Sequence, residues 1–262
     1  QTGDDQCTLF QRTTGMGGVV GSSDLSTTKK LYIPLQFWFC RNPGLALPLI
    51  ALQYHEVKVI LNHDMAAMFT TTNGTNKLWA DYIYLDTDER RRFAQVSHEY
   101  LIEQVQEQSL TNEDGTNDLN FNHPVKELVW RKKDNAKATD NNAPVASNVS
   151  TYQLKLNGHD RFAARDFRYF TRTQVWEHHS GAGGLDCDAA AGAGKFNDSI
   201  AVYSFALKPE EHQPSGTCNF SRIDNAQLIC AGAGTGAADT CYAVNYNVLR
   251  IMSGMGGLAY SN

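Results

Sequence analysis

The sequence lacks the motifs by which most enzymes and membrane proteins are recognised. It contains no G-x-S-x-G, no H-E-x-x-H, no phosphate-binding loop and no dinucleotide fingerprint. None of its apolar runs approaches the roughly 18 residues that a membrane-spanning helix needs. Its six cysteines form no C-x-x-C pair and no Cys/His ligand spacing. We therefore expect no catalytic residue, no cofactor, no metal site and no membrane span.

The chain also lacks an excess of positive charge. Its formal net charge is −5, and charged residues make up 19% of it. A protein that binds nucleic acid non-specifically does so through a basic surface, so we expect no direct binding to nucleic acid. The chain begins at Gln1, without an initiator Met, a charged n-region or an apolar h-region. We therefore expect a fragment in which no signal peptide is visible.

What the chain does contain is a series of strand-like apolar segments. The longest begins at Leu31 and reads LYIPLQFWFCRNPGLALPLIALQYHEVKVIL. Large side chains fall on both faces of its first part, which predicts a strand that is covered on both sides. A change of apolar phase after Tyr54 predicts a β-bulge. Strands are predicted at 31–39, 51–61, 77–85, 99–106, 125–131, 151–156, 200–207, 219–230 and 242–251.

Many short strands separated by long loops predict an all-β sandwich or barrel. With 262 residues, the chain has the length of one large β domain or two smaller ones. Only residues 87–95 have the pattern of a helix. Thr87 is its expected N-cap, and Asp88 and Glu89 suit the positive end of the helix dipole.

Several blocks of sequence resemble one known family. PGLALPLIALQYHEVKV, which begins at Pro43, resembles the segment that marks major capsid proteins of large icosahedral double-stranded DNA viruses of eukaryotes. The phycodnavirus (chlorovirus) type is nearest, with iridovirus capsid proteins as relatives. The likeness continues in the family's order through residues 79–104, 119–130, 156–165, 203–226 and 245–262. The Gly/Ala-rich segments 180–194 and 231–238 depart from the pattern and are expected to be variable loops.

The resemblance implies two jelly rolls in tandem, of which this chain holds only part. Residues 97–262 would form a complete second jelly roll. Residues 1–96 would supply the later strands of the first, with residues 1–30 as a loop or disordered lead-in, and its early strands would be missing. A half jelly roll exposes apolar surface and unpaired edges, so we expect the first third to fold poorly by itself.

The function that the resemblance implies is mechanical. Members of the family form homotrimers whose jelly rolls build pseudo-hexagonal capsomers, and these tile an icosahedral shell. The implied partners are copies of the chain, neighbouring capsomers and minor capsid proteins, and the implied location is the virion, after assembly in the host cytoplasm. Tyr169, Phe170 and Trp176 are candidate interface anchors. The alternative is that these three aromatic side chains fill the core.

Sequons and cysteines offer further candidate sites. Asn73, Asn148 and Asn197 are the candidates for covalent glycans, whereas Asn219 is the poorest because it lies in a predicted strand. Cytoplasmic assembly favours free buried thiols. A bridge between the cysteines at 230 and 241 stays open as an alternative.

One histidine pair suggests a metal site at first sight. His178 and His179 follow Glu177, but adjacent residues of a strand point to opposite faces and make a poor clamp. A solvated loop is the favoured interpretation of this segment.

Three other function classes remain open at this stage. A carbohydrate-binding β-sandwich would expose Trp and Tyr along a concave face. A β-sandwich glycosidase would need two carboxyl groups about 5–10 Å apart in a cleft. A minor or vertex capsid protein would share the fold. The extent of the likeness favours a major capsid protein over all three.

Overall fold

The computed structural model describes residues 34–61, 77–111, 114–131, 149–180, 200–232 and 239–260. The chain divides into two compact units, and the divisions fall between residues 100 and 101 and between residues 247 and 248. Residues 101–247 make up nearly all of the larger unit. Within the described ranges, no helix is long and apolar enough to cross a membrane.

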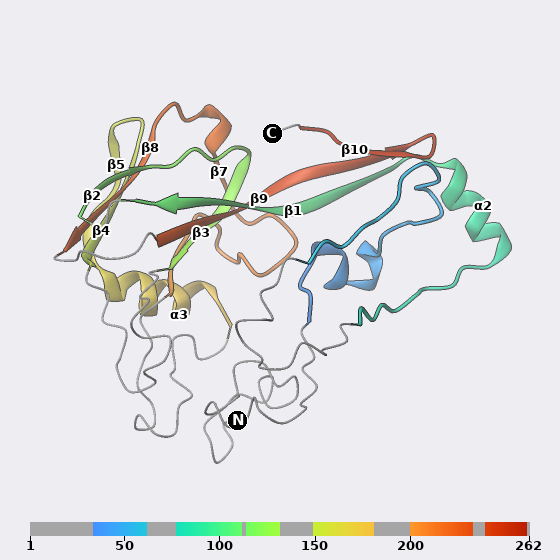
Figure 1. Ribbon diagram of the computed structural model, residues 1–262, viewed down its shortest axis with the longest axis horizontal. Coiled ribbons are helices and arrows are strands. Elements are labelled where there is room, and N and C mark those ends of the chain that lie inside the picture. Colours follow the sequence, from blue (N-terminus) through green and yellow to red (C-terminus); the bar gives the residue numbers. More distant parts are fainter. Residues whose placement is uncertain are drawn as a thin grey trace, which may run out of the picture. The chain divides into compact units, whose positions relative to one another are not determined.

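Eight main strands form two antiparallel sheets, and Figure 1 labels all of these strands except β6. The first sheet has the order β1-β9-β3-β6, formed by β1 (His98–Leu110), β9 (Asp239–Met252), β3 (Pro124–Arg131) and β6 (Ile200–Ser204). The short strands β7 (Cys218–Asn219) and β10 (Met255–Leu258) pair with β3 and β9. The second sheet has the order β2-β8-β4-β5, formed by β2 (Gly115–Asp118), β8 (Ala226–Gly232), β4 (Val149–Leu156) and β5 (His159–Asp166).

The order of the strands defines a jelly roll. The chain changes sheet at every connection between the eight main strands except the β4–β5 hairpin. Strands that are distant in the sequence therefore become neighbours, as in two interleaved Greek keys. The strand order thus gives a complete jelly roll between His98 and Met252. Its place as the second of two such domains, with a boundary at residue 97, stays a prediction.

The core of the larger unit lies between the two sheets and is rich in aromatic rings. Trp130 of β3 contacts Tyr152 of β4 with ring centroids 5.2 Å apart, and both rings contact Phe170. The predicted strand at 151–156 is confirmed as β4, in which Tyr152 and Leu154 are buried. The strand predicted at 200–207 is shorter in the structure, since β6 ends at Ser204 and Leu207 is exposed.

The β4–β5 hairpin turns on an Asn-Gly pair. Asn157 and Gly158 have positive φ values of 52° and 79°, which a two-residue type I′ turn requires. The Asn157 side chain also accepts hydrogen bonds from the backbone N–H groups of Asp224 (2.9 Å) and Asn225 (3.2 Å). The turn therefore joins β5 to β4 and also anchors the segment that leads into β8.

The predicted helix at 87–95 is confirmed as α2 (Thr87–Gln95). Its N-cap is Asp86 rather than Thr87, because the Asp86 carboxylate accepts a 2.8 Å hydrogen bond from the backbone N–H of Glu89. Thr87 is the first helical residue. A carboxylate one residue earlier thus takes the capping role, and its charge also suits the positive end of the helix.

Three predicted strands are wrong within the described residues. No residue of 34–61 or 77–97 lies in a strand. The first of these ranges forms two short 3₁₀ helices, η2 (Trp38–Cys40) and η3 (Pro43–Leu45), then turns and extended chain, so the predicted β-bulge has no strand to occupy. A strand needs neighbours that satisfy its backbone N–H and C=O groups, and apolar pattern alone does not supply them. The cover predicted for the first part of the run is incomplete, since Phe37 is exposed. Further along the chain, Tyr54, Ile60, Trp79 and Tyr84 are largely exposed as well.

Candidate functional site

A β-bulge in β3 turns two charged residues toward one face of its sheet. The pairing of β3 with β9 shifts register between Val125 and Glu127. Val125 and Leu128 both lie in the core. The bulge therefore leaves two consecutive residues, Lys126 and Glu127, directed away from the core. Both are nevertheless buried, because segments from elsewhere in the chain cover this outer face.

Lys126 is fixed by a buried ion pair. Its ammonium group donates to a carboxylate oxygen of Glu103 on β1 (2.7 Å) and to the backbone carbonyl of Pro209 (2.6 Å). It also lies 5.4 Å from the ring centroid of Tyr246 on β9. The Lys126 side chain is only 1% exposed. The pair thereby joins β1, β3 and the loop that follows β6.

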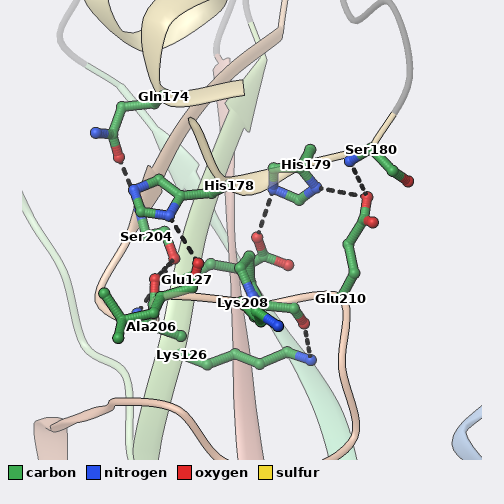
Figure 2. Close-up of polar contacts among 12 residues, drawn as sticks. Lys126, Glu127, Gln174, His178, His179, Ser180, Ser204, Ala206, Lys208 and Glu210 are labelled. Atoms are coloured by element: carbon green, nitrogen blue, oxygen red, sulfur yellow. Dashed lines mark hydrogen bonds and ion pairs between the residues drawn. The ribbon is translucent and has the colours of Figure 1, made fainter. Parts of the chain in front are cut away.

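His179 lies between two carboxylates, as Figure 2 shows. It is the C-cap of α3 (Gln174–His178). Its Nε2 atom is 3.0 Å from Oε2 of Glu127, and its Nδ1 atom is 3.2 Å from Oε1 of Glu210. The hydrogen bond to Glu127 raises the pKa of His179, and partial burial opposes that rise without cancelling it. Burial acts to raise the pKa of Glu210, but hydrogen bonds from Ser180 and His179 outweigh it and leave that pKa lowered.

Gln174 fixes the other end of the same helical segment. Its side-chain oxygen accepts from the backbone N–H of Ser204 (3.1 Å), and its amide nitrogen donates to the hydroxyl of Tyr169 (3.0 Å). His178 adds a contact between Nδ1 and the backbone carbonyl of Leu207 (3.1 Å). The π-helical turn η4 (Tyr169–Thr173) and α3 are therefore held against the end of β6.

Lys126, Glu103, Glu127, His179 and Glu210 form what we call the polar layer. Their contacts are of the kind that stabilise a fold. The two ring nitrogens of His179 face different carboxylates, so these three groups do not converge on one point. In the described ranges, no group of three His, Cys, Asp or Glu side chains is arranged to hold a metal ion. The expectation of a solvated loop at His178 and His179 is wrong, because both are half-buried at the end of a helix.

The structure separates the three predicted interface aromatics. Phe170 is 0% exposed and belongs to the core, so its ring offers no surface to a partner. Tyr169 is partly buried against that core, with the guanidinium of Arg165 4.3 Å from its ring centroid. Trp176 is 81% exposed on α3. The core alternative therefore describes Phe170, whereas an interface role for Trp176 stays a prediction.

The predicted glycan sites fall outside the described residues. Asn73, Asn148 and Asn197 all lie in the undescribed ranges, so their glycosylation stays a prediction. Asn219, the least favoured sequon, lies at the end of β7, and its side-chain oxygen accepts a hydrogen bond from the backbone N–H of Ser221.

The described cysteines are free thiols. Cys230 and Cys241 are buried, and the bridge considered between them is not formed. Burial, reinforced by the neighbouring Cys230, raises the pKa of Cys241 to about 12. Cys218 is half-buried, and burial raises its pKa too. Cys40 is exposed.

Residues of the polar layer were missed by the sequence interpretation. The signal was the pair Lys126-Glu127 inside an otherwise apolar strand, where alternation alone would direct one of the two into the core. A charged pair at that position indicates a bulge. Neither the pattern of β3 nor its charges reveals that Glu103, Glu210 and His179 are the partners.

Comparisons with known proteins agree on one family. The model of the large eukaryotic DNA virus major capsid protein family matches residues 89–257, and that of the major capsid protein N-terminus matches residues 11–86. The chain is 53% identical to a major capsid protein of Pyramimonas orientalis virus over 251 residues, covering 90% of this chain and 63% of that protein. It is 39% identical over 315 residues to a major capsid protein of Paramecium bursaria Chlorella virus 1, covering 93% of this chain and 69% of that protein.

A solved structure gives the same result. The chain matches the structure titled "PBCV-1 virus capsid, quasi-atomic model" with a TM-score of 0.64 and 34% sequence identity, over 89% of this chain and 71% of that chain. This match confirms the predicted all-β, double jelly-roll class. The chain spans less than two thirds of the length of the Pyramimonas orientalis virus protein. Strand order, sequence blocks and fold thus agree, and the chain belongs to the family of major capsid proteins of large eukaryotic DNA viruses, which are structural proteins of the virion rather than enzymes.

Proposed function

We propose that this protein is a subunit of an icosahedral viral shell. It forms homotrimers, the jelly rolls of each trimer make a pseudo-hexagonal capsomer, and capsomers contact one another and minor capsid proteins. The observation that carries the proposal is the complete jelly roll between His98 and Met252, in a chain of the major capsid protein family. The related proteins of known name support the same role, since they are called major capsid proteins.

The jelly roll suits this role because it hides most of its backbone. Two sheets enclose one aromatic-rich core, and few strand edges remain open to uncontrolled pairing. On the outer face of the β1-β9-β3-β6 sheet, Lys126 binds Glu103 and the carbonyl of Pro209, and His179 at the end of α3 contacts Glu127. A sheet held by such contacts resists deformation, while the loops remain available for contacts between subunits.

The exposed indole of Trp176 is the side chain that we propose as an interface anchor. Large aromatic residues are enriched at the centres of protein–protein interfaces. Trp176 lies on α3, whose two ends are held by Gln174 and His179. An anchor on a fixed helix loses little conformational freedom when a partner covers it.

We also propose that residues 1–96 belong to a first jelly roll that is incomplete in this chain, and that residues 97–262 contain the second. The largely exposed side chains of Tyr54, Ile60, Trp79 and Tyr84 support this proposal. In a longer protein, further strands would cover such side chains and pair with the extended segments that carry them.

The remaining parts of the proposal concern location and chemistry. The protein is assembled in the host cytoplasm and becomes part of the virion, where surface asparagines carry glycans. It has no catalytic activity and does not bind the genome directly. The formal net charge of −5 supports the last point, because a genome-binding shell would present a basic surface.

Solution mass tests the assembly. We would measure it by light scattering for this chain and for a version extended at its N-terminus. We expect a trimer from the extended chain, with interfaces above about 2,000 Å² each, and aggregation or an unfolded first third from the 262-residue chain.

Two results would contradict the proposal, each in a different part. A monomeric extended chain would refute trimer formation. A well-behaved monomer of residues 1–262 would refute the incomplete first jelly roll. In that second case, a glycan-array screen would test the carbohydrate-binding alternative.

A further inference from the structure

We propose that His179 is a pH-dependent clamp that fastens α3 and the loop after β6 to the outer face of β3. The three groups of the clamp come from separate parts of the larger unit. Glu127 belongs to β3, His179 caps α3, and Glu210 lies in the loop that follows β6. Figure 2 shows the imidazole ring between the two carboxylates.

Hydrogen-bond chemistry makes this arrangement specific for one protonation state. A neutral imidazole has one N–H group, so it can donate to only one carboxylate at a time. The imidazolium ion has two N–H groups, and the 3.0 Å and 3.2 Å contacts to Glu127 and Glu210 use both. Removal of one proton therefore breaks one side of the clamp and leaves a lone pair facing a carboxylate.

The charges around His179 favour its protonated form. On β3, the Lys126 ammonium is engaged with Glu103, and in the loop after β6 the Lys208 ammonium contacts Glu211 at 3.0 Å. On α3, the Glu177 carboxylate is 4.0 Å from the ring of His178. Among the residues that the structure describes, His179 is the cationic partner of both Glu127 and Glu210.

The direction of the pH effect follows from the direction in which the pKa of His179 is shifted. Hydrogen bonding to Glu127 raises the pKa of His179 above its ordinary value of 6.5. The clamp is therefore complete below pH 6.5 and is lost as the pH rises through the raised pKa. Because α3 carries the exposed Trp176, a pH below 6.5 would hold this helix in place and a pH above the raised pKa would loosen it.

Imidazole NMR tests the protonation state directly. In the full chain labelled with ¹⁵N-histidine, we expect both ring nitrogens of His179 to carry a proton at pH 6, and most rings to keep both protons at pH 6.5, because the pKa is raised. A ring with a single proton at pH 6 would overturn the proposal. This measurement needs no assembled trimer, so its outcome is independent of the proposed capsid function.

Amide hydrogen exchange tests the mechanical consequence. We would measure protection factors, corrected for the intrinsic pH dependence of exchange, from pH 6 to 9. The backbone N–H of His179 and that of Ser204 report on the clamped segment. In the wild type, we expect local opening to increase by up to about tenfold per pH unit between pH 6.5 and the raised pKa. The corrected protection factors of amides in the β4–β8 ladder should not show this dependence on pH.

Variants test whether the pH dependence of local opening comes from the clamp or from general effects of pH on the protein. His179→Gln should abolish the pH dependence of local opening, and Glu210→Gln should reduce it. Glu210 has a side chain that is 44% exposed, so its substitution tests the clamp even if His179→Gln does not fold. His159→Gln, at the exposed start of β5, is the matched control and should keep the wild-type pH dependence. Equal pH dependence in the wild type, His179→Gln and Glu210→Gln would overturn the proposal.

Discussion

The side chain of Gln106 pairs with the backbone of Asn122 as a neighbouring strand would. Its Nε2 donates to the Asn122 carbonyl at 2.8 Å, and its Oε1 accepts from the Asn122 backbone N–H at 3.0 Å. Gln108, two residues further along β1, binds the carbonyl of Asp118 and the backbone N–H of Asn120 in the same way. Two glutamines on one face of β1 thus hold the crossover from β2 to β3.

Gln106→Ala should lower the free energy of unfolding by about 1–2 kcal/mol, because three hydrogen bonds are lost where water can partly replace them. Urea denaturation followed by fluorescence measures the change. Glu107→Ala is the matched control, since its side chain lies on the exposed face of β1. An equal effect of both substitutions would show that the glutamine contacts do not stabilise the crossover.

Lys126→Met should be much more destabilising, by about 3–5 kcal/mol, because it leaves the buried Glu103 carboxylate without its ammonium partner. The double variant Lys126→Met/Glu103→Leu should recover part of this loss, since it removes both buried charges. Denaturation of the wild type, both single variants and the double variant gives the coupling energy. A double variant less stable than Lys126→Met would argue against a desolvated ion pair.

Phe170→Ala and Trp176→Ala should act on different properties. We expect Phe170→Ala to lower the free energy of unfolding by about 3–5 kcal/mol, since a fully buried ring leaves a cavity. Trp176→Ala should change it by less than about 0.5 kcal/mol, because its ring is exposed. In the N-terminally extended chain, Trp176→Ala should instead weaken the trimer in light scattering. An unchanged trimer would remove Trp176 from the proposed interface.

Cys241 should not react with iodoacetamide at pH 8 while the protein is folded. Its thiol is fully buried with a pKa of about 12, so almost none of it is the nucleophilic thiolate. Cys40 is exposed and should be alkylated under the same conditions. Peptide mapping by mass spectrometry distinguishes the two sites. Rapid alkylation of Cys241 without unfolding would show that the core opens there.

Local pattern predicted the elements of the larger unit well and those of the smaller unit poorly. In the larger unit, strands are present at 125–131, at 151–156 and through most of 242–251. In the smaller unit, the helix at 87–95 is the predicted element that is present among the described residues. β5 was missed although Asn157-Gly158 is a strong hairpin signal, and β10 was missed because glycines such as Gly256 and Gly257 are depleted in strands. Residues 51–61 and 77–85 have strand-like composition but no neighbouring strand in the described structure.

The sequence by itself determined the family, through blocks that resemble major capsid proteins, and with it the fold class. It also determined most of the strands of the larger unit and the helix at 87–95, because periodicity and caps act over a few residues. Only the tertiary structure decided which side chains form the polar layer. Lys126 and Glu103 are 23 residues apart, and His179 is 52 residues from Glu127 and 31 from Glu210. Such pairs arise where a jelly roll brings distant strands together and a single bulge reverses the direction of a side chain, and neither event leaves a periodic signal in the chain.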